Sequence, residues 1–183
     1  MKTFSRYVSL LLFICIGIGT TSCSPRLHNQ SAGGAEIVTT DTVSQQFNLQ
    51  LDFMKHHFSG MLIARRMTDD EVRLLFTSYF GLSIFDFSLR GDSLHVNSCI
   101  EPMRKKNLLR ILEHDFKQVF LPNQPVRIKE KSAIFERRTS GKGMGKTIIS
   151  LSQFSGSQPQ RIQIKHPWIR LKIQLDKLEP NNP

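Results

Sequence analysis

One run in the sequence has residue types that could bind a nucleotide. Residues 141–147 read GKGMGKT, and loops that surround phosphates with backbone N–H groups are similarly rich in glycine and end in Lys-Thr. Such a loop needs four residues between its two glycines and leads into a helix, whereas three residues separate Gly141 from Gly145 and the β-branched stretch 147–154 follows. The run is therefore predicted to be a basic turn between two strands, with glycine supplying positive φ.

The other residues that could carry chemistry form incomplete groups. His56 and His57 are adjacent in an expected strand, so they point to opposite faces and cannot share one metal ion without distortion. Residues 113–115, Glu-His-Asp, lie on an expected helix, where neighbouring side chains diverge by about 100°. Cys99 lacks the His and Asn pattern of a cysteine nucleophile, and neither G-x-S-x-G nor H-E-x-x-H occurs. We expect no metal site, no cofactor and no enzymatic activity.

The N-terminus has the pattern of an export signal. Lys2 and Arg6 precede an apolar run, residues 8–18, that is shorter than the roughly 20 residues needed to cross a bilayer. Residues 20–23, TTSC, resemble the lipobox of bacterial lipoproteins. The resemblance implies that residues 1–22 are removed and that Cys23 becomes a lipidated N-terminus. An ordinary secretory signal, with Cys23 unmodified, is the alternative.

Lipidation at Cys23 makes a membrane the expected partner. Several acyl chains anchor a protein firmly because each buried methylene contributes about 0.8 kcal/mol. Cys15 lies within the signal, so Cys99 would be the one thiol of the mature chain not used for lipidation, and a single thiol cannot form an internal disulfide.

The charge of the chain favours anionic neighbours. The sequence has 25 Lys and Arg against 15 Asp and Glu, and removal of residues 1–22 takes away two basic residues and no acidic one. We expect contacts with a membrane or lipid and none with nucleic acid, because no nucleic-acid-binding motif is present. The alternative is that the basic residues form the solvated face of a sheet.

Composition divides the mature chain into two parts. Residues 23–46 are rich in Ser, Gly, Thr, Gln and Asn and are predicted to be a flexible linker. Dense apolar patterning begins at Phe47, so residues 47–180 are predicted to form a single lipid-binding-like β domain.

Apolar residues in the domain alternate with period two on both sides of one helical segment. Strands are predicted at 47–53, 57–66, 72–76, 82–89, 94–96, 126–129, 132–138, 147–154, 161–166 and 168–178, with an amphipathic helix at 103–120. The predicted fold is mainly β (α+β), a strongly curved antiparallel sheet or incomplete barrel with the helix on its concave side.

A curved sheet of this kind could enclose an acyl chain. The expected apolar cavity is lined by Leu51, Phe53, Leu62, Leu74, Phe76, Phe85, Phe87 and Phe116. The alternative is that the same side chains fill a packed core, and the sequence does not decide between the two.

The order of elements resembles that of the lipoprotein-localisation factors, a periplasmic carrier and its outer-membrane acceptor that share an incomplete barrel covered by helices. The likeness lies in pattern over most of 47–180, above all in QPQRIQIKHPWIRLKIQLDKLEPN (158–181) and FSGMLIARRMTDDEVRLLF (58–76). It implies a lipid-anchored acceptor that takes acylated lipoproteins from a carrier at the bacterial outer membrane. Phe80, in the turn SYFG, would be the exposed apolar residue that inserts into the membrane, unless it belongs to the core.

Two functions of different classes remain open. The first is binding of acyl chains or lipoproteins, with Arg137, Arg138, Lys142 and Lys146 contacting an anionic membrane or partner. The second is a non-catalytic accessory or structural role, in which the domain docks onto an envelope complex. Residues 24–26 lack acidic side chains, which favours a domain facing the periplasm.

Overall fold

Two runs of five strands flank a single α-helix in the computed structural model, which describes residues 37–68, 70–122 and 124–179. The first run comprises β1 (Gln45–Phe53), β2 (His56–Thr68), β3 (Glu71–Ser78), β4 (Ser83–Arg90) and β5 (Ser93–Cys99). A 3-10 turn, η1 (Glu101–Met103), and the helix α2 (Lys106–Phe120) follow. The second run comprises β6 (Arg127–Lys131), β7 (Phe135–Ser140), β8 (Thr147–Ser155), β9 (Gln158–His166) and β10 (Leu171–Leu178), with a 3-10 turn, η2 (Gly143–Gly145), before β8.

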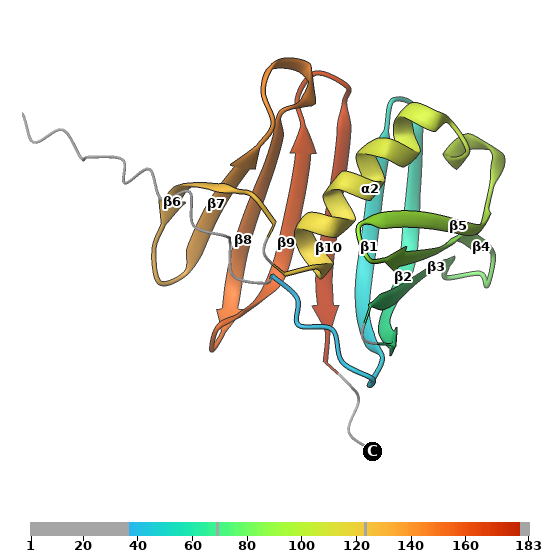
Figure 1. The fold of residues 1–183 in the computed structure, drawn as a ribbon, viewed down its shortest axis with the longest axis horizontal. Coiled ribbons are helices and arrows are strands. Elements are labelled where there is room, and N and C mark those ends of the chain that lie inside the picture. Colours follow the sequence, from blue (N-terminus) through green and yellow to red (C-terminus); the bar gives the residue numbers. More distant parts are fainter. Residues whose placement is uncertain (1–36, 69, 123, 180–183) are drawn as a thin grey trace, which may run out of the picture.

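All ten strands belong to one antiparallel sheet in the order β5-β4-β3-β2-β1-β10-β9-β8-β7-β6 (Figure 1). The last strand pairs with the first, with Leu51 opposite Ile173, so the two runs are joined at the middle of the sheet. The outer strands β5 and β6 do not pair with each other, which leaves the sheet unclosed. The prediction of a mainly β, antiparallel fold with one main helix is confirmed.

The predicted alternation explains which face of the sheet is buried. Phe47, Leu49 and Leu51 of β1 have no exposed surface, whereas residues 48 and 50 between them are partly exposed. Burying a large apolar side chain contributes about 1.5–3 kcal/mol, so a register shift that turned this face to solvent would be strongly unfavourable.

Helix α2 contributes its apolar stripe to the same core. Figure 1 shows it crossing one face of the sheet. Its Phe116 ring lies 5.7 Å from the ring of Phe85, and its Phe120 ring lies 6.1 Å from that of Phe47, measured between centroids. The helix begins at Lys106 rather than near Met103, because residues 101–103 form a separate 3-10 turn and Lys105 has an extended backbone. No helix among the described residues is sufficiently long and apolar to cross a membrane.

The antiparallel order places the turns β1–β2, β3–β4, β7–β8 and β9–β10 at one end of the sheet, together with the start of α2. We call this the upper end, since the first of these turns, the β7–β8 loop and the β9–β10 turn lie at the top of Figure 1. Residues 37–44 and the remaining turns lie at the opposite, lower end. The chain therefore enters the fold far from the upper-end turns.

Two segments differ from the prediction. Ile37 and Val38, assigned by composition to the linker, are buried, and the Val38 N–H donates to the carbonyl of Val119 at 3.1 Å. These two apolar residues pack against the core, so residues 37–44 belong to the fold. Residues 168–170, predicted as the start of the last strand, form a turn in which Arg170 has a φ of 52°. The signal segment and Cys23 lie outside the described residues.

Candidate functional site

Seven of the eight side chains expected to line a cavity lie in the packed core. Leu51, Leu62, Leu74, Phe76, Phe85, Phe87 and Phe116 have no exposed surface. Their rings pack on one another, with centroids 4.3 Å apart for Phe85 and Phe87 and 5.2 Å apart for Phe76 and Phe85. A side chain without accessible surface borders no water-sized space, so these residues fill the interior. Phe53 is partly buried and lines a pocket at the surface.

That pocket lies at the upper end and is mainly apolar. We call it the apolar pocket; its volume is about 720 Å³, and its lining is Phe53, Met54, Lys55, His56, Lys105, Asn107, Leu108, Ile111, Trp168, Ile169 and Arg170. These residues come from the β1–β2 turn, the start of α2 and the β9–β10 turn. Its lining includes basic side chains and no acidic one.

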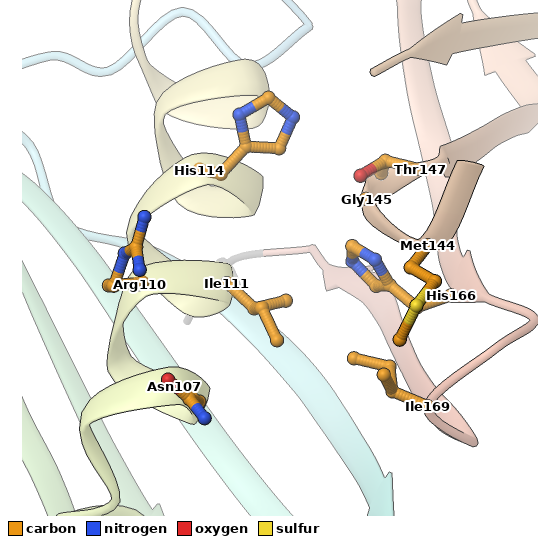
Figure 2. Close-up of a pocket in the computed structure, with 9 residues that line it drawn as sticks. All are labelled: Asn107, Arg110, Ile111, His114, Met144, Gly145, Thr147, His166 and Ile169. Carbon is orange, nitrogen blue, oxygen red and sulfur yellow. The ribbon is translucent and has the colours of Figure 1, made fainter. Parts of the chain in front are cut away.

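A second pocket adjoins the first and is more polar. This polar pocket has a volume of about 540 Å³ and is lined by Asn107, Arg110, Ile111, His114, Met144, Gly145, Thr147, His166 and Ile169 (Figure 2). Asn107, Ile111 and Ile169 line both pockets, so the two pockets adjoin, and we call them together the upper groove. The polar pocket also lacks an acidic lining residue.

A buried Asp–His pair supports the wall of the polar pocket. His166 Nε2 lies 2.9 Å and 2.7 Å from the two carboxylate oxygens of Asp115, and both side chains are buried. Burial raises the pKa of Asp115, because a charged carboxylate is poorly solvated there, and the contact with His166 opposes this effect. The pair fixes α2 against β9, so it positions one side of the pocket relative to the other.

The other polar groups of this pocket are Thr147, His114, Arg110 and Asn107. Thr147 is fully buried, and its hydroxyl oxygen has no hydrogen-bond partner. His114 on α2 contacts the Ser140 hydroxyl at 2.9 Å through Nε2, and Figure 2 shows its ring on the side of the helix that faces Thr147. Arg110 also lines the pocket, and Figure 2 shows its side chain extending along the helix on the side away from Thr147 and His166. The arrangement offers hydrogen-bond donors to a ligand and is better suited to binding an anion than to nucleophilic catalysis.

Apart from Phe53, the residues of the groove were not identified from the sequence. Asp115 was considered only beside its helix neighbours, and its partner His166 lies 51 residues away. Ile111 and Ile169 were assigned to the apolar faces of a helix and a strand. Trp168 was placed within a strand, although it lies in a turn and is 67% exposed.

Phe80 lies outside the core. It is 99% exposed in the β3–β4 turn, and its neighbours Tyr79 and Leu82 are also largely exposed. A turn with three exposed large apolar side chains is unusual for a surface in contact only with water. Of the two interpretations left open by the sequence, the structure favours the exposed apolar turn.

The four basic residues expected to contact a membrane do not share one surface. Lys142 and Lys146 are exposed in the β7–β8 loop at the upper end. Arg137 is exposed on β7, where it pairs with Glu130 at 3.2 Å and lies over the Phe135 ring. Arg138 was wrongly assigned to the surface. Adjacent strand residues point to opposite faces, so Arg138 is buried and pairs with Glu136.

The GKGMGKT run is a turn between strands, as predicted. Gly141 and Gly143 have φ of 69° and 55°, and strand β8 follows at Thr147. A Cβ on Gly141 would lie 2.2 Å from the carbonyl oxygen of Gly145, so the tight return of this loop requires glycine. The loop carries Met144, which is 75% exposed, to the edge of the upper groove.

The two ends of the sheet differ in charge. The four upper-end turns carry Lys55, Lys142, Lys146 and Arg170 and no acidic residue. The connections described at the lower end carry Asp41, Asp70 and Asp92 and no basic residue. The upper end therefore attracts anions, and the groove opens within this positive region.

The described residues contain no cluster of three or more His, Cys, Asp or Glu side chains that could hold a metal ion. No protein-family model matches the chain, and no curated protein matches it significantly in sequence.

Proposed function

We propose that this chain is a lipid-anchored envelope protein that binds acyl chains in the upper groove. The chains belong to a lipid or an acylated lipoprotein, and the protein acts as a carrier or acceptor at the periplasmic face of the bacterial outer membrane. The lipobox at residues 20–23 supports anchoring through Cys23. The apolar pocket with its unpaired basic rim carries the rest of the proposal.

The apolar pocket suits a hydrocarbon chain. Its volume of about 720 Å³ falls within the roughly 300–1,000 Å³ typical of small-molecule sites. Ile111 and Ile169 lie in its wall, while Met54 and Trp168, at its mouth, are 69% and 67% exposed. An acyl chain would cover this exposed surface and gain about 0.8 kcal/mol for each methylene removed from water.

The rim favours an amphiphile with negative charge. Lys55, Lys105 and Arg170 line the apolar pocket, and none of them makes an ion pair within the described residues. Cations that lack a carboxylate partner remain available for a ligand. An uncharged hydrocarbon would leave these groups unused, whereas a lipid with an anionic head would engage them.

The β3–β4 turn and the β7–β8 loop, on strands six positions apart in the sheet order, each carry side chains suited to contact with a membrane. Phe80 and its neighbours could enter the interfacial region, while Lys142 and Lys146 face the anionic lipid head groups. Each such lysine contributes about 1 kcal/mol near an anionic bilayer at moderate ionic strength. This use of Phe80 agrees with the resemblance to the lipoprotein-localisation factors, which is part of the proposal.

We also propose that the sheet curves around α2 as an incomplete barrel. Strands β4 and β9 are five positions apart in the sheet order, which corresponds to about 24 Å in a flat sheet. Two adjacent helix residues nevertheless contact both strands, since Phe116 packs on Phe85 and Asp115 pairs with His166. These contacts support a sheet with the helix on its concave side.

Acyl binding can be tested with the mature chain, residues 23–183, carrying Cys23→Ser so that it has no lipid of its own. Isothermal titration with a 16-carbon amphiphile should show saturable binding. Ile111→Trp would fill the groove and weaken binding at least tenfold. The matched control is Leu109→Trp, because Leu109 lies two residues earlier on α2 and lines neither pocket; this variant should bind normally. Absence of binding to the parent chain would contradict the proposal.

The filled core favours a second function. If the interior and the groove both stay empty of lipid, the exposed apolar turn at Phe80 would instead dock onto a protein of the envelope. In that case Phe80→Ser should abolish cross-linking to a specific partner in intact cells, while the Ile111→Trp variant should cross-link normally. If both variants still cross-linked to the partner, this alternative would be contradicted.

A further inference from the structure

We propose that the polar pocket binds the phosphate head group of the amphiphile whose acyl chain occupies the apolar pocket. This inference rests on the proposed function. It adds a ligand class, a lipid with a phosphate group, and a site for that group. The two pockets share the lining residues Asn107, Ile111 and Ile169, so they adjoin, and the proposed ligand places its chain in one and its head group in the other.

The polar pocket presents donors from both of its walls. Asn107, Arg110 and His114 belong to α2. Thr147 is the first residue of β8 and lies across the pocket from the helix (Figure 2). Neither the Asn107 amide nor the Arg110 guanidinium has a hydrogen bond or ion pair within the described residues, and the Thr147 hydroxyl oxygen is buried without a partner. Thr147 has no exposed surface, so a ligand reaches this hydroxyl only when neighbouring side chains move; completing its hydrogen bond would then offset the cost of its burial.

Nearby carboxylates do not oppose an anion in this pocket. Asp115 is covered by His166, which contacts both of its oxygens. Glu113 is engaged by Lys117 at 3.2 Å on a different side of the helix. The Arg110 side chain is exposed and unpaired, so it can turn from its position along the helix toward a ligand without breaking another contact.

Phosphate matches these donors better than a carboxylate does. A phosphate group offers several acceptor oxygens in a tetrahedral arrangement, so it can accept from α2 and from β8 at once. A carboxylate offers two oxygens in one plane and would reach fewer of the groups. Arginine also binds phosphate in bidentate geometry.

The test compares two single-chain lipids that share a palmitoyl chain. Isothermal titration measures the affinity of the mature Cys23→Ser chain for each lipid. The first is palmitoyl lysophosphatidic acid, which has a phosphate monoester, and the second is monopalmitoylglycerol, which is neutral. One charge-assisted contact predicts that the phosphate lipid binds about tenfold more tightly or better. Inorganic phosphate is the third ligand, and we expect its binding to be at least 100-fold weaker because the acyl contribution is missing.

Variants assign the preference to the pocket. Arg110→Gln should reduce the ratio between the two lipids to near one, and Thr147→Val should reduce it several-fold. The matched control Arg127→Gln removes an exposed arginine of β6 at the far edge of the sheet and should leave the ratio unchanged.

The outcomes separate this inference from the proposed function. Equal affinities for both lipids, or an unchanged ratio in Arg110→Gln, would overturn the phosphate site and leave acyl binding intact. Tight binding of inorganic phosphate would overturn a lipid as the source of the phosphate. Failure of both lipids to bind would contradict the proposed function itself.

Discussion

Replacement of Thr147 by valine should stabilise the protein, because its hydroxyl is buried without a hydrogen-bond partner. An unsatisfied buried polar group costs about 1–3 kcal/mol, and valine keeps the shape of the side chain while removing that group. We expect the free energy of unfolding to rise by about 1 kcal/mol, which raises Tm by roughly 3–4 °C for a domain of this size.

Thr40 provides a matched control of the same residue type. It is 4% exposed, and its hydroxyl accepts a hydrogen bond from Arg66 Nη2 at 3.0 Å. Thr40→Val removes this acceptor, so the free energy of unfolding should fall by about 1 kcal/mol. The two substitutions remove the same hydroxyl group from a buried site, and the hydroxyl has a partner at Thr40 and none at Thr147.

Differential scanning calorimetry and urea unfolding of the lipid-free chain at neutral pH measure both effects. The predicted result is a Tm above that of the parent for Thr147→Val and below it for Thr40→Val. If both variants were destabilised to the same extent, the Thr147 hydroxyl would have a partner in solution, and the reasoning that gives this pocket an unused donor would be refuted.

Three further predictions follow from the charged groups. Arg138→Ala should destabilise the protein by up to about 3–5 kcal/mol in urea unfolding, because the buried Glu136 loses its close partner and keeps only the 3.6 Å contact with the exposed Lys131, whereas Arg137→Ala, whose pair is exposed, should change stability by less than about 1 kcal/mol; equal effects would contradict the burial of Arg138. The raised pKa of Asp115 means that its stabilising contribution is full below its unfolded pKa of about 3.9 and is lost as pH rises through the folded value. The Tm of Asp115→Asn relative to the parent should therefore increase as pH rises above about 4, and a constant difference would argue against this. Lys142→Glu with Lys146→Glu should weaken sedimentation with anionic vesicles by more than tenfold, whereas Arg127→Glu with Lys129→Glu, two exposed residues of β6 whose reversal changes the net charge equally, should have little effect; equal losses would show that only net charge matters.

The strands and helix could be predicted because their signals are local. Period two in β1 and β10 and the three-to-four spacing in α2 specify which face is buried, and burial decides the element. Gly60 is a similar case. A glycine inside a strand pattern indicates a bulge or a close backbone approach, and at Gly60 a Cβ would lie 2.0 Å from the Thr77 carbonyl oxygen.

The groove could not be predicted because it depends on which distant elements meet. The pairing of β1 with β10 brings residues 53–56 beside residues 168–170, more than a hundred positions away. The Asp115–His166 pair arises only when α2 lies across β9. The apolar positions of the core were identified correctly, but pattern alone does not distinguish a side chain that lines a cavity from one that fills it.

The burial of Arg138 shows where the sequence held an unused signal. Alternation along 135–140 places Glu136 and Arg138 on one face and Arg137 on the other. Opposite charges two residues apart on the same face of a strand suggest a pair that can be buried together. The principle that separated His56 from His57 would have separated these two arginines.

Methyl-labelled NMR during titration with a 16-carbon phosphate lipid tests the central proposal most directly. Acyl binding in the upper groove predicts chemical-shift changes and intermolecular contacts at the methyl groups of Ile111 and Ile169, with little change at Leu62 and Leu74 in the packed core. Contacts at Leu62 and Leu74 instead, or a spectrum that does not change at saturating lipid, would contradict it.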